Sequence, residues 1–393
     1  MTIIKSCTSF AGVVIVLALS IFMISNPSAA LQASTAGLQL WFDTVLPALF
    51  PFFVVCDLMV NIGIVQFMAR LLQPAMQKMF RLPGEAGFVI AMGFTSGFPV
   101  GAVLVRQLFK ENLLNREQAE HLVSFTNNAS PLFIIGIVGI GLFNSPTLGY
   151  LLAFSHYMSN LLLGFILGRA RSNSIPISPS TSSLSTAFSE LIGPKPSPGI
   201  LLGEAIKKAL ANVTMVGGFI ISFSVLTSAL SEWGFIGTVA SLFHMLGISY
   251  PCSWGLGIGL FEMTIGAQAI SISTGTHVEK ILAVTALLAW SGISVQAQVM
   301  SIVSDLAIRY SYYLKARILQ AVLSFGFTIV GLQLVSDRLL QEVFRISPGL
   351  ASWPSSLNFL QVSLLGILVS LSFLTIISIL SWLKTVSPSR SVH

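Results

Sequence analysis

Apolar residues in this chain gather in long stretches that short polar segments separate. A helix needs about 20 mostly apolar residues to cross the hydrocarbon core of a bilayer. Stretches of about that length occupy residues 6–25, 44–65, 119–143, 147–168, 212–231, 281–303, 314–336 and 360–383. Two further stretches, 86–106 and 251–275, are rich in glycine and interrupted by polar residues. The pattern predicts an all-α polytopic membrane protein in which these two stretches form re-entrant helical hairpins.

Small, polar and helix-breaking residues interrupt the apolar pattern at two places in each half of the chain. The four segments are Gly93–Pro99, Phe125–Pro131, Phe261–Gly266 and Trp290–Gln296. Non-helical backbone at membrane depth is tolerated only where it is buried in protein or lines a wet cavity. Corresponding breaks in two halves are typical of the midplane binding site of a secondary transporter.

The order of elements repeats along the chain. Each half starts with an amphipathic stretch, 31–43 or 200–211, and continues with a span, a hairpin, an interrupted span and an intact span. Thr95 and Thr264 differ by 169 positions, and Asn127 and Ser291 by 164. The predicted units are an N-terminal helix (1–30), a first repeat (31–170), a Ser- and Pro-rich linker (171–199), a second repeat (200–340) and a C-terminal helix with a tail (341–393). For the N-terminal helix, an uncleaved span is favoured over a cleaved signal peptide.

Composition and charge agree with a membrane protein. Charged residues make up 9% of the chain and hydrophobic residues 54%, whereas soluble proteins carry about 25% charged residues. With a cytoplasmic N-terminus and re-entrant hairpins, 17 of the 20 Lys and Arg residues fall on the cytoplasmic side, as the positive-inside rule requires. This topology makes the two repeats inverted. It also accounts for the net charge of +6 without a nucleic-acid partner.

Candidate substrate-binding residues lie at the predicted hairpin tips and at the interruptions. A tip between two half-helices presents backbone N–H groups and a helix dipole that attract anions. The tips contribute Thr95, Ser96, Gly97, Glu262 and Thr264, and the interruptions contribute Asn127, Asn128, Ser130, Ser291 and Ser294. Polar clusters at matching positions favour a polar substrate. The structural alternatives are close helix packing through small residues and hydrogen bonds between helices.

Two acidic residues within apolar stretches, Asp57 and Glu262, are candidates for coupling transport to protons or sodium. The alternative for each carboxylate is a nearby structural partner. We expect His156 to be a hydrogen-bonded packing residue, and Asp305 and Arg309 to form an ordinary surface pair four positions apart. The sequence contains no metal-ligand cluster, phosphate-binding loop or nucleophile with a paired base. It therefore predicts neither an enzyme nor a cofactor, and transport would be driven by a gradient or a partner.

Three segments of the first half carry a family resemblance. They are Val45–Phe53 after Trp41, Gly93–Ala102 and Phe125–Pro131. Together they resemble the YlbJ-like sporulation integral membrane proteins of spore-forming Firmicutes, which belong to the nucleoside-recognition or gate superfamily. The resemblance covers about residues 30–340. It implies a fold similar to concentrative nucleoside transporters, in which hairpins and broken helices enclose the substrate.

The resemblance also implies a role in sporulation, with transport of dipicolinic acid from the mother cell across the outer forespore membrane. The carboxylates of this planar dianion would meet the tip amides and the polar residues of the interruptions. Its ring would pack on Phe94, Phe98, Phe125 or Trp290. Because the topology places every Lys and Arg outside the bilayer, no arginine is expected beside the substrate.

Two other functions remain open at this point. One is transport of a nucleoside or nucleobase by the same fold, and the other is a non-transporting membrane scaffold for spore assembly. The predicted partners are thus the lipid bilayer and a small anionic or nucleoside-like molecule. Analogy with the fold class adds a homo-oligomer as a further expectation.

Overall fold

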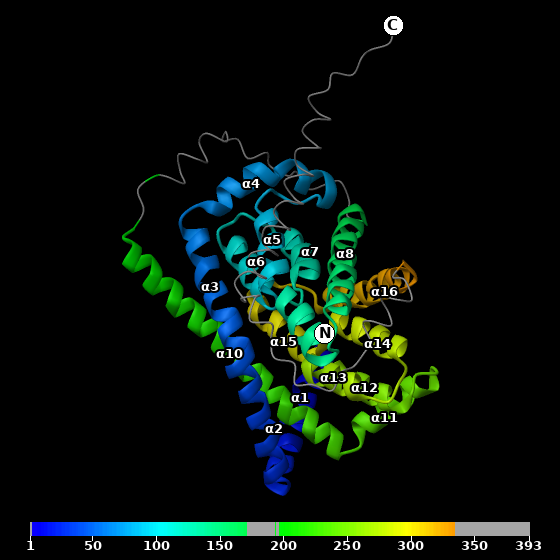
Figure 1. The fold of residues 1–393 in the computed structure, drawn as a ribbon. Helices are drawn as coiled ribbons and strands as arrows, with labels where there is room; N and C mark the ends of the chain where they lie inside the picture. Colours follow the sequence, from blue (N-terminus) through cyan, green and yellow to red (C-terminus); the bar gives the residue numbers. More distant parts are fainter. Residues whose placement is uncertain (1, 171–192, 194–195, 335–393) are drawn as a thin grey trace.

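In the computed structural model, which describes residues 2–170, 193 and 196–334, every regular element is a helix (Figure 1). The first half contains α1 (Thr2–Ser25), α2 (Pro27–Leu40), α3 (Leu46–Asn61), α4 (Ile64–Ala75), α5 (Ala86–Ser96), α6 (Val100–Lys110), α7 (Arg116–Thr126) and α8 (Pro146–Ala170). The second half contains α10 (Pro198–Glu232), α11 (Phe235–Met245), α12 (Tyr250–Phe261), α13 (Met263–Ile272), α14 (His277–Trp290), α15 (Gly292–Ile302) and α16 (Tyr310–Leu334). Shorter segments are η1 (Trp41–Val45), η2 (Met76–Phe80), η3 (Leu132–Leu142) and η4 (Ser304–Leu306). The predicted all-α class is confirmed, whereas the predicted span 360–383 and most of the linker 171–199 lie outside the described residues.

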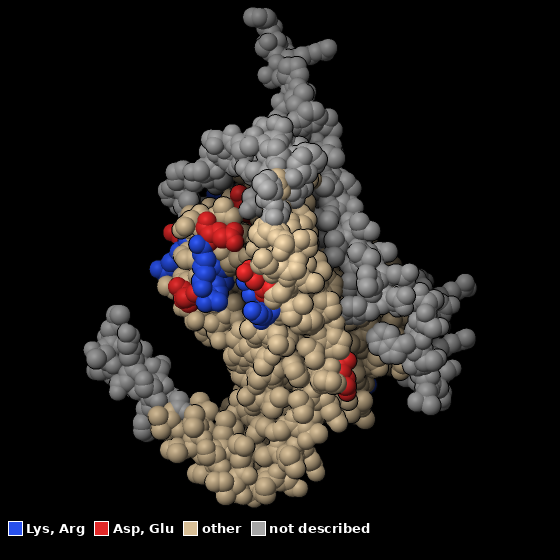
Figure 2. All heavy atoms as spheres, turned by 90° about the vertical axis from the view of Figure 1, so that its left-hand side faces the viewer, with Lys and Arg blue, Asp and Glu red and all other residues tan. Residues whose placement is uncertain are grey.

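Several helices are long and apolar enough to cross a membrane. They are α8, α10, α16 and the α14–α15 pair taken together, and the pair Val13–Ser25 and Pro27–Asp43, bent by 108°, adds a fifth candidate. Large apolar side chains such as Val322 and Leu334 are exposed on these helices. Lys, Arg, Asp and Glu gather at one end of the face shown in Figure 2, and a wide uncharged surface lies beyond them. These features are consistent with the predicted polytopic membrane protein.

Two long helical stretches pack together: the continuous run α2–η1–α3 and the 35-residue helix α10. A Cβ on Gly37 would lie 2.7 Å from the hydroxyl oxygen of Ser224, and one on Gly217 would lie 2.6 Å from the Trp41 ring. The indole N–H of Trp41 donates to the carbonyl of Val213 at 2.9 Å. Because later residues of one stretch meet earlier residues of the other, the two run antiparallel (Figure 1).

The amphipathic stretch expected at 200–211 is not a separate element. It is the first third of α10, which continues without a break through the predicted span 212–231. No glycine or proline lies between Glu204 and Val216, and Ala, Leu and Lys, which favour helix, are frequent there. The chain therefore has no local reason to turn at this point.

The first glycine-rich stretch forms two half-helices, α5 and α6, that fold back on each other around Gly97–Pro99. Gly97 has φ of +84°, a conformation that favours glycine. Gly93 and Gly101, on either side of the turn, both face the carbonyl of Thr126, and a Cβ on them would lie 2.4 and 2.7 Å from that oxygen. The turn between α5 and α6 is thus held against the end of α7.

The second glycine-rich stretch forms the half-helices α12 and α13, with Glu262 as the single extended residue between them. A Cβ on Gly266 would lie 2.3 Å from the Cα of Gly259, and one on Gly255 would lie 2.7 Å from the Ile270 side chain. The contacting pairs, Gly259 with Gly266 and Gly255 with Ile270, lie at nearly matching distances before and after Glu262 in the sequence. The two half-helices therefore run antiparallel. Glycine is required where their backbones touch.

The helix breaks recur at one spacing. The first turn centres on Phe98 and the second on Glu262, 164 positions later. Helices α7 and α14 end just before Asn127 and Ser291, which are also 164 positions apart. The spacing of the two turns thus equals the 164 positions between Asn127 and Ser291, and it differs by five from the 169 positions between Thr95 and Thr264.

Candidate functional site

A partly open cavity of about 100 Å³ lies where the two turns, the first interruption and the start of α15 meet. Its polar lining consists of Ser96, Ser130, Glu262, Thr264, Ser294 and Gln298. Its apolar lining includes Phe98, Phe133 and Met263, with Val45, Leu49, Val216 and Ile220 from the long antiparallel stretches. Both halves of the chain therefore contribute to one mixed polar and apolar cavity.

Ser96 and Gly97 bring the first turn to the cavity. The hydroxyl of Ser96 is buried, with the weakly hydrogen-bonding thiol of Cys56 nearby, and has no hydrogen-bond partner of ordinary geometry among the described residues. A Cβ on Gly97 would lie 2.8 Å from the backbone nitrogen of Ser130, so the turn touches the interruption. Thr95 does not line the cavity, because its hydroxyl donates to the carbonyl of Ala91 at 2.9 Å within α5.

Asn127 caps a neighbouring helix. Its side-chain oxygen accepts a hydrogen bond from the backbone N–H of Ala102 at 2.9 Å, near the start of α6, and its amide group donates to the carbonyl of Val123 at 2.8 Å. One of the backbone donors that we expected to face an anion is therefore already satisfied by the protein. Asn128 is also buried, with its amide group donating to Phe125 and its side-chain oxygen lacking a partner in the described part of the chain.

The rest of the first interruption is held from α8. The backbone N–H of Ala129 donates to Nε2 of His156 at 3.3 Å, and the Tyr157 hydroxyl donates to the carbonyl of Ala129 at 2.9 Å. The expectation of a hydrogen-bonded His156 agrees with this contact. Ser130 lines the cavity, and its hydroxyl accepts from the N–H of Phe133 at the start of η3.

Glu262 is a capping residue in the second half. Its carboxylate accepts a hydrogen bond from the N–H of Ile265 at 2.7 Å and so caps the start of α13. The side chain is 4% exposed and lies on the cavity wall beside Thr264. A buried carboxylate in a cavity can accept hydrogen bonds from a bound molecule or carry a proton.

Ser291 forms the second interruption without lining the cavity. It has φ of +72° and no longer continues α14, while Gly292 begins α15. A Cβ on Gly292 would lie 3.1 Å from the backbone nitrogen of Met263, so this interruption touches the second turn. Ser294, one turn further along α15, lines the cavity and lies within 3.5 Å of the Gln298 side-chain nitrogen.

Six of the ten predicted substrate-binding residues line the cavity, namely Ser96, Gly97, Ser130, Glu262, Thr264 and Ser294. The remaining four, Thr95, Asn127, Asn128 and Ser291, lie behind its wall and shape the backbone. Of the aromatic residues expected around a ring, Phe98 lines the cavity. Phe94 stacks on Tyr157, Phe125 stacks on Phe80, and the Trp290 indole donates to the carbonyl of Leu260.

Among the described residues the cavity lining contains no arginine, but one arginine is buried within a candidate membrane span, where the topology predicted none. Arg317 in α16 is fully buried, and its guanidinium donates to the backbone carbonyls of Asn127, at 3.1 Å, and Ser124. A third contact joins it to the side-chain oxygen of Asn160 at 3.5 Å. The charge count had placed this residue on the cytoplasmic side, together with Arg309 and Lys315.

A polar stripe along α16 was the signal that could have revealed this burial. Arg317, Gln320, Ser324 and Thr328 recur at intervals of three or four positions, and all are at most 1% exposed. Residues at this spacing share one face of a helix. In an otherwise apolar span, such a face must meet protein rather than lipid.

Asp57 lies outside the cavity, in a larger depression of about 590 Å³ at the charged end of the molecule. Its carboxylate accepts hydrogen bonds from Nζ of Lys208 at 2.9 Å and from the Asn61 amide at 2.8 Å. The ion pair links α3 to α10. Arg106 and Lys110 of α6 line the same depression.

Asp305 and Arg309 do not pair with each other. Asp305 receives hydrogen bonds from Nε of Arg106, at 2.9 Å, and lies 3.3 Å from Nζ of Lys110. These contacts, with that of Arg106 the largest, hold the pKa of the Asp305 carboxyl below its ordinary value. Arg309 instead pairs with Glu120 of α7. Helical spacing alone missed both partners, which are nearly two hundred positions away in the chain.

Apolar helices of membrane-crossing length around a small cavity of mixed lining define this chain as a multi-pass membrane protein. Residues 42–146, which include α5, α6 and the first interruption, match the family model Gate, described as nucleoside recognition. No solved structure matches the chain.

A curated relative identifies the family. The chain is 38% identical over 322 residues to the sporulation integral membrane protein YlbJ of Bacillus subtilis (strain 168), and the match covers 78% of this chain and 79% of that protein. The chain therefore belongs to the family of YlbJ sporulation integral membrane proteins.

Proposed function

We propose that the chain is a secondary transporter for a small aromatic carboxylate, with dipicolinic acid as the substrate that the family resemblance favours. The observation that carries the proposal is the cavity lined by both turns, to which Ser96, Ser130 and Ser294 contribute together with Phe98. Hydroxyl donors beside an aromatic ring suit a flat molecule with polar edges. The sporulation name of the YlbJ relative supports action in sporulating cells. The outer forespore membrane is the location that the family resemblance implies.

We further propose that the halves are inverted repeats and that both glycine-rich stretches are re-entrant hairpins. The common spacing of 164 positions supports the repeat. The antiparallel packing of α2–η1–α3 against α10 supports inversion, because equivalent elements related by a two-fold axis run antiparallel. In this arrangement residues 31–170 and 200–340 are the repeats, and a site between them can be exposed to either side in turn. The N-terminus is then cytoplasmic.

The cavity volume sets a condition on transport. A cavity of about 150 Å³ holds a benzene molecule, whereas this cavity measures about 100 Å³. A ring with two carboxylates therefore requires movement of a turn or of the wall formed by α3 and α10.

Glu262 is the residue to which we assign coupling. Asp57 is already paired with Lys208 and lies outside the cavity, whereas Glu262 lies on its wall. An ionised carboxylate there would repel a dianion, so a proton on Glu262 would accompany the substrate. Thr95, Asn127, Asn128 and Ser291 are proposed to hold the backbone around the substrate.

Transport of a nucleoside or nucleobase is the second candidate. Two observations favour it: the nucleoside-recognition description of the Gate model and the carboxylate of Glu262, which can accept hydrogen bonds from sugar hydroxyl groups. A non-transporting scaffold is the third. A homo-oligomer is compatible with all three.

Ligand-dependent thermal stability of the purified protein separates these candidates. We expect dipicolinate to raise the unfolding temperature in wild-type protein and in the control Ser224→Ala, whose hydroxyl is bonded within α10. Ser96→Ala and Ser294→Ala should each reduce the shift. A response to uridine in place of dipicolinate would favour the second candidate, and a response to neither would favour the scaffold.

A further inference from the structure

Arg317 carries a buried positive charge with no carboxylate partner in the described part of the chain. Its side chain is fully buried, and the ion pairs among the described residues all involve other cations. Its contacts are two backbone carbonyls, the Asn160 amide oxygen and the face of Tyr313, with 5.2 Å from the guanidinium carbon to the ring centre. Its Nε has no hydrogen-bond partner there.

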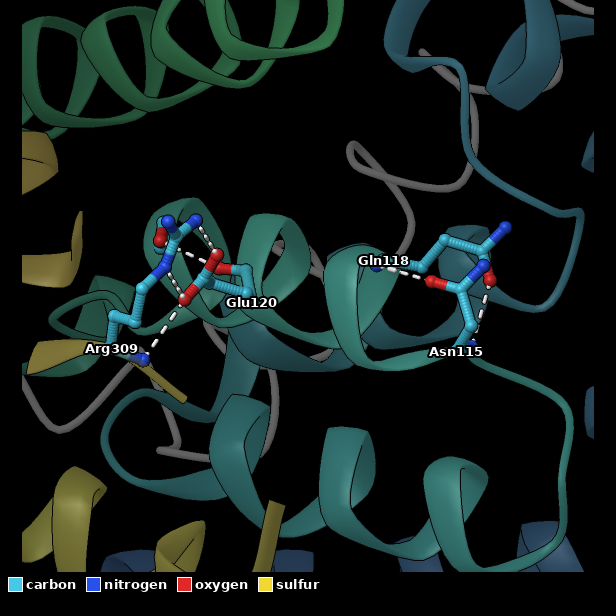
Figure 3. A network of polar contacts seen from close by, with 5 residues as sticks. Asn115, Gln118, Glu120 and Arg309 are labelled. Carbon is cyan, nitrogen blue, oxygen red and sulfur yellow. Dashed lines mark hydrogen bonds and ion pairs between the residues drawn. The ribbon is translucent and has the colours of Figure 1, made fainter. Parts of the chain in front are cut away.

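The position of Arg317 follows from a contact two helical turns away. Glu120 of α7 receives three hydrogen bonds from Arg309: from the backbone nitrogen at 2.9 Å, from Nε at 3.0 Å and from Nη2 at 2.6 Å (Figure 3). This contact fixes the start of α16 beside α7. Arg317, eight positions further on, thereby reaches Ser124 and Asn127 at the end of α7.

The two carbonyls explain how the protein accommodates the charge, but they do not cancel it. Unsatisfied carbonyls at a helix C-terminus carry about half a negative charge in total. Arginine stays protonated in proteins, so a net positive potential remains. In a low-dielectric interior that potential extends further than it would in water.

The first interruption connects Arg317 to the cavity wall. Arg317 donates to the carbonyl of Asn127. Two and three positions further along the chain, Ala129 and Ser130 line the cavity. The side chain of Asn127 also caps α6, whose preceding turn supplies Ser96 and Phe98. Arg317 thus stands behind the cavity wall and contacts it through one backbone segment.

We propose that Arg317 is the positioning and selectivity residue of this cavity. It fixes the carbonyls of the α7 interruption, and its uncompensated charge makes the cavity prefer organic carboxylates to neutral molecules of the same shape. This inference rests on the proposed transport of an aromatic carboxylate, because it assigns the source of the selectivity for that substrate class.

The test compares two probes of one shape on the full-length protein. Pyridine-2,6-dicarboxylate carries two negative charges, and pyridine-2,6-dicarboxamide carries none. Isothermal titration of wild type, R317Q and R317K gives the ratio of the two affinities. We expect R317Q to weaken binding of the dianion about tenfold and of the diamide by less than about twofold, and R317K to keep the preference for the dianion.

Three further variants separate charge from structure. Q320E keeps the arginine and adds an opposing charge three positions along α16, whereas Q320M is its neutral counterpart. Q320E should lower the preference for the dianion and Q320M should retain it, which keeps the test decisive if R317Q does not fold. R309Q removes the ion pair with Glu120 that joins α16 to α7. It should change the binding of both probes equally.

The outcomes distinguish the inference from the function on which it rests. If wild type prefers the dianion and both R317Q and Q320E keep that preference, the role of Arg317 is overturned while the proposed substrate class stands. If R317Q and Q320E weaken the binding of both probes equally, the selectivity role of Arg317 is also overturned, and Arg317 is a structural residue. Wild-type protein that binds neither probe contradicts the proposed function itself.

Discussion

Gly97 and Ser130 touch where the turn between α5 and α6 meets the interruption after α7. A Cβ on Gly97 would lie 2.8 Å from the backbone nitrogen and 2.9 Å from the Cβ of Ser130. Because both residues also line the cavity, the same contact sets the fold of the first half and one wall of the site. Gly292 and Met263 form a corresponding contact in the second half.

Replacing Gly97 by alanine is expected to destabilise the protein by about 2 kcal/mol or more, because the backbone has φ of +84° and the new methyl group has no space. Transport should fall in parallel. Gly218→Ala in α10 is the matched control, since no atom lies within 4 Å of its Cβ position. Unfolding in detergent measures both variants, and equal stability of Gly97→Ala and wild type would contradict the described contact.

The Asp57–Lys208 pair should behave as a structural link between α3 and α10. The lysine side chain is 52% exposed, so the pair is partly hydrated, and we expect a coupling energy of about 1 kcal/mol or less. A double-mutant cycle with Asp57→Asn and Lys208→Gln measures this energy. Asp57→Asn should leave the pH dependence of uptake unchanged, and a shifted pH profile would restore Asp57 as a coupling residue.

Glu262→Gln should separate coupling from folding. Glutamine keeps an oxygen that accepts from the N–H of Ile265, so the change in stability should be below about 1 kcal/mol. Uptake by this variant should lose its dependence on pH. Glu262→Ala, which removes the cap, is the contrasting variant and should lose about 1 kcal/mol. An unaltered pH profile in Glu262→Gln would exclude this residue as the proton carrier.

Asp305 should make a small, pH-dependent contribution to stability. Arg106 and Lys110 lower the pKa of its carboxyl in the folded protein, so its stabilisation is present above the unfolded-state pKa of about 3.9 and is lost as pH falls through the folded-state pKa. The Arg106 and Asp305 side chains are 43% and 38% exposed, which limits the effect to about 1 kcal/mol or less. Unfolding temperatures should therefore separate Asp305→Asn from wild type at neutral pH and converge in acid.

Glu111→Gln is the matched control for Asp305, since among the described residues the Glu111 carboxylate accepts one weak 3.3 Å bond, from Gln107 one turn away. It should change stability little at any pH. High salt should reduce the effect of Asp305→Asn by screening. If Asp305→Asn differs from wild type in stability as much in acid as at neutral pH, the ionised pair is not the cause of that difference.

The helix breaks were predictable because their causes are local. Gly97 and Pro99 break one helix, Pro131 follows another break, and Gly292 follows a third, and each acts through its own backbone geometry. Polar residues at those breaks had to be enclosed by protein, which is why Ser96, Ser130 and Ser294 could be expected in the cavity.

The partners of the polar residues were not predictable, because they come from distant parts of the chain. Asn127 and Glu262 looked like groups for a substrate, but their oxygens cap α6 and α13. Arg317 looked like a surface residue because the charge count treats each basic residue singly. Its contact with Asn127 spans 190 positions and arises only when α16 packs on α7.

Uptake into proteoliposomes tests the central claim most directly. Vesicles containing wild-type protein are expected to take up labelled dipicolinate with saturation, and excess uridine should not compete. The double variant Ser96→Ala/Ser294→Ala should lose about 90% of the uptake while the control Ser224→Ala retains it. Uptake no faster than in empty vesicles, or uptake of uridine in place of dipicolinate, would contradict the account.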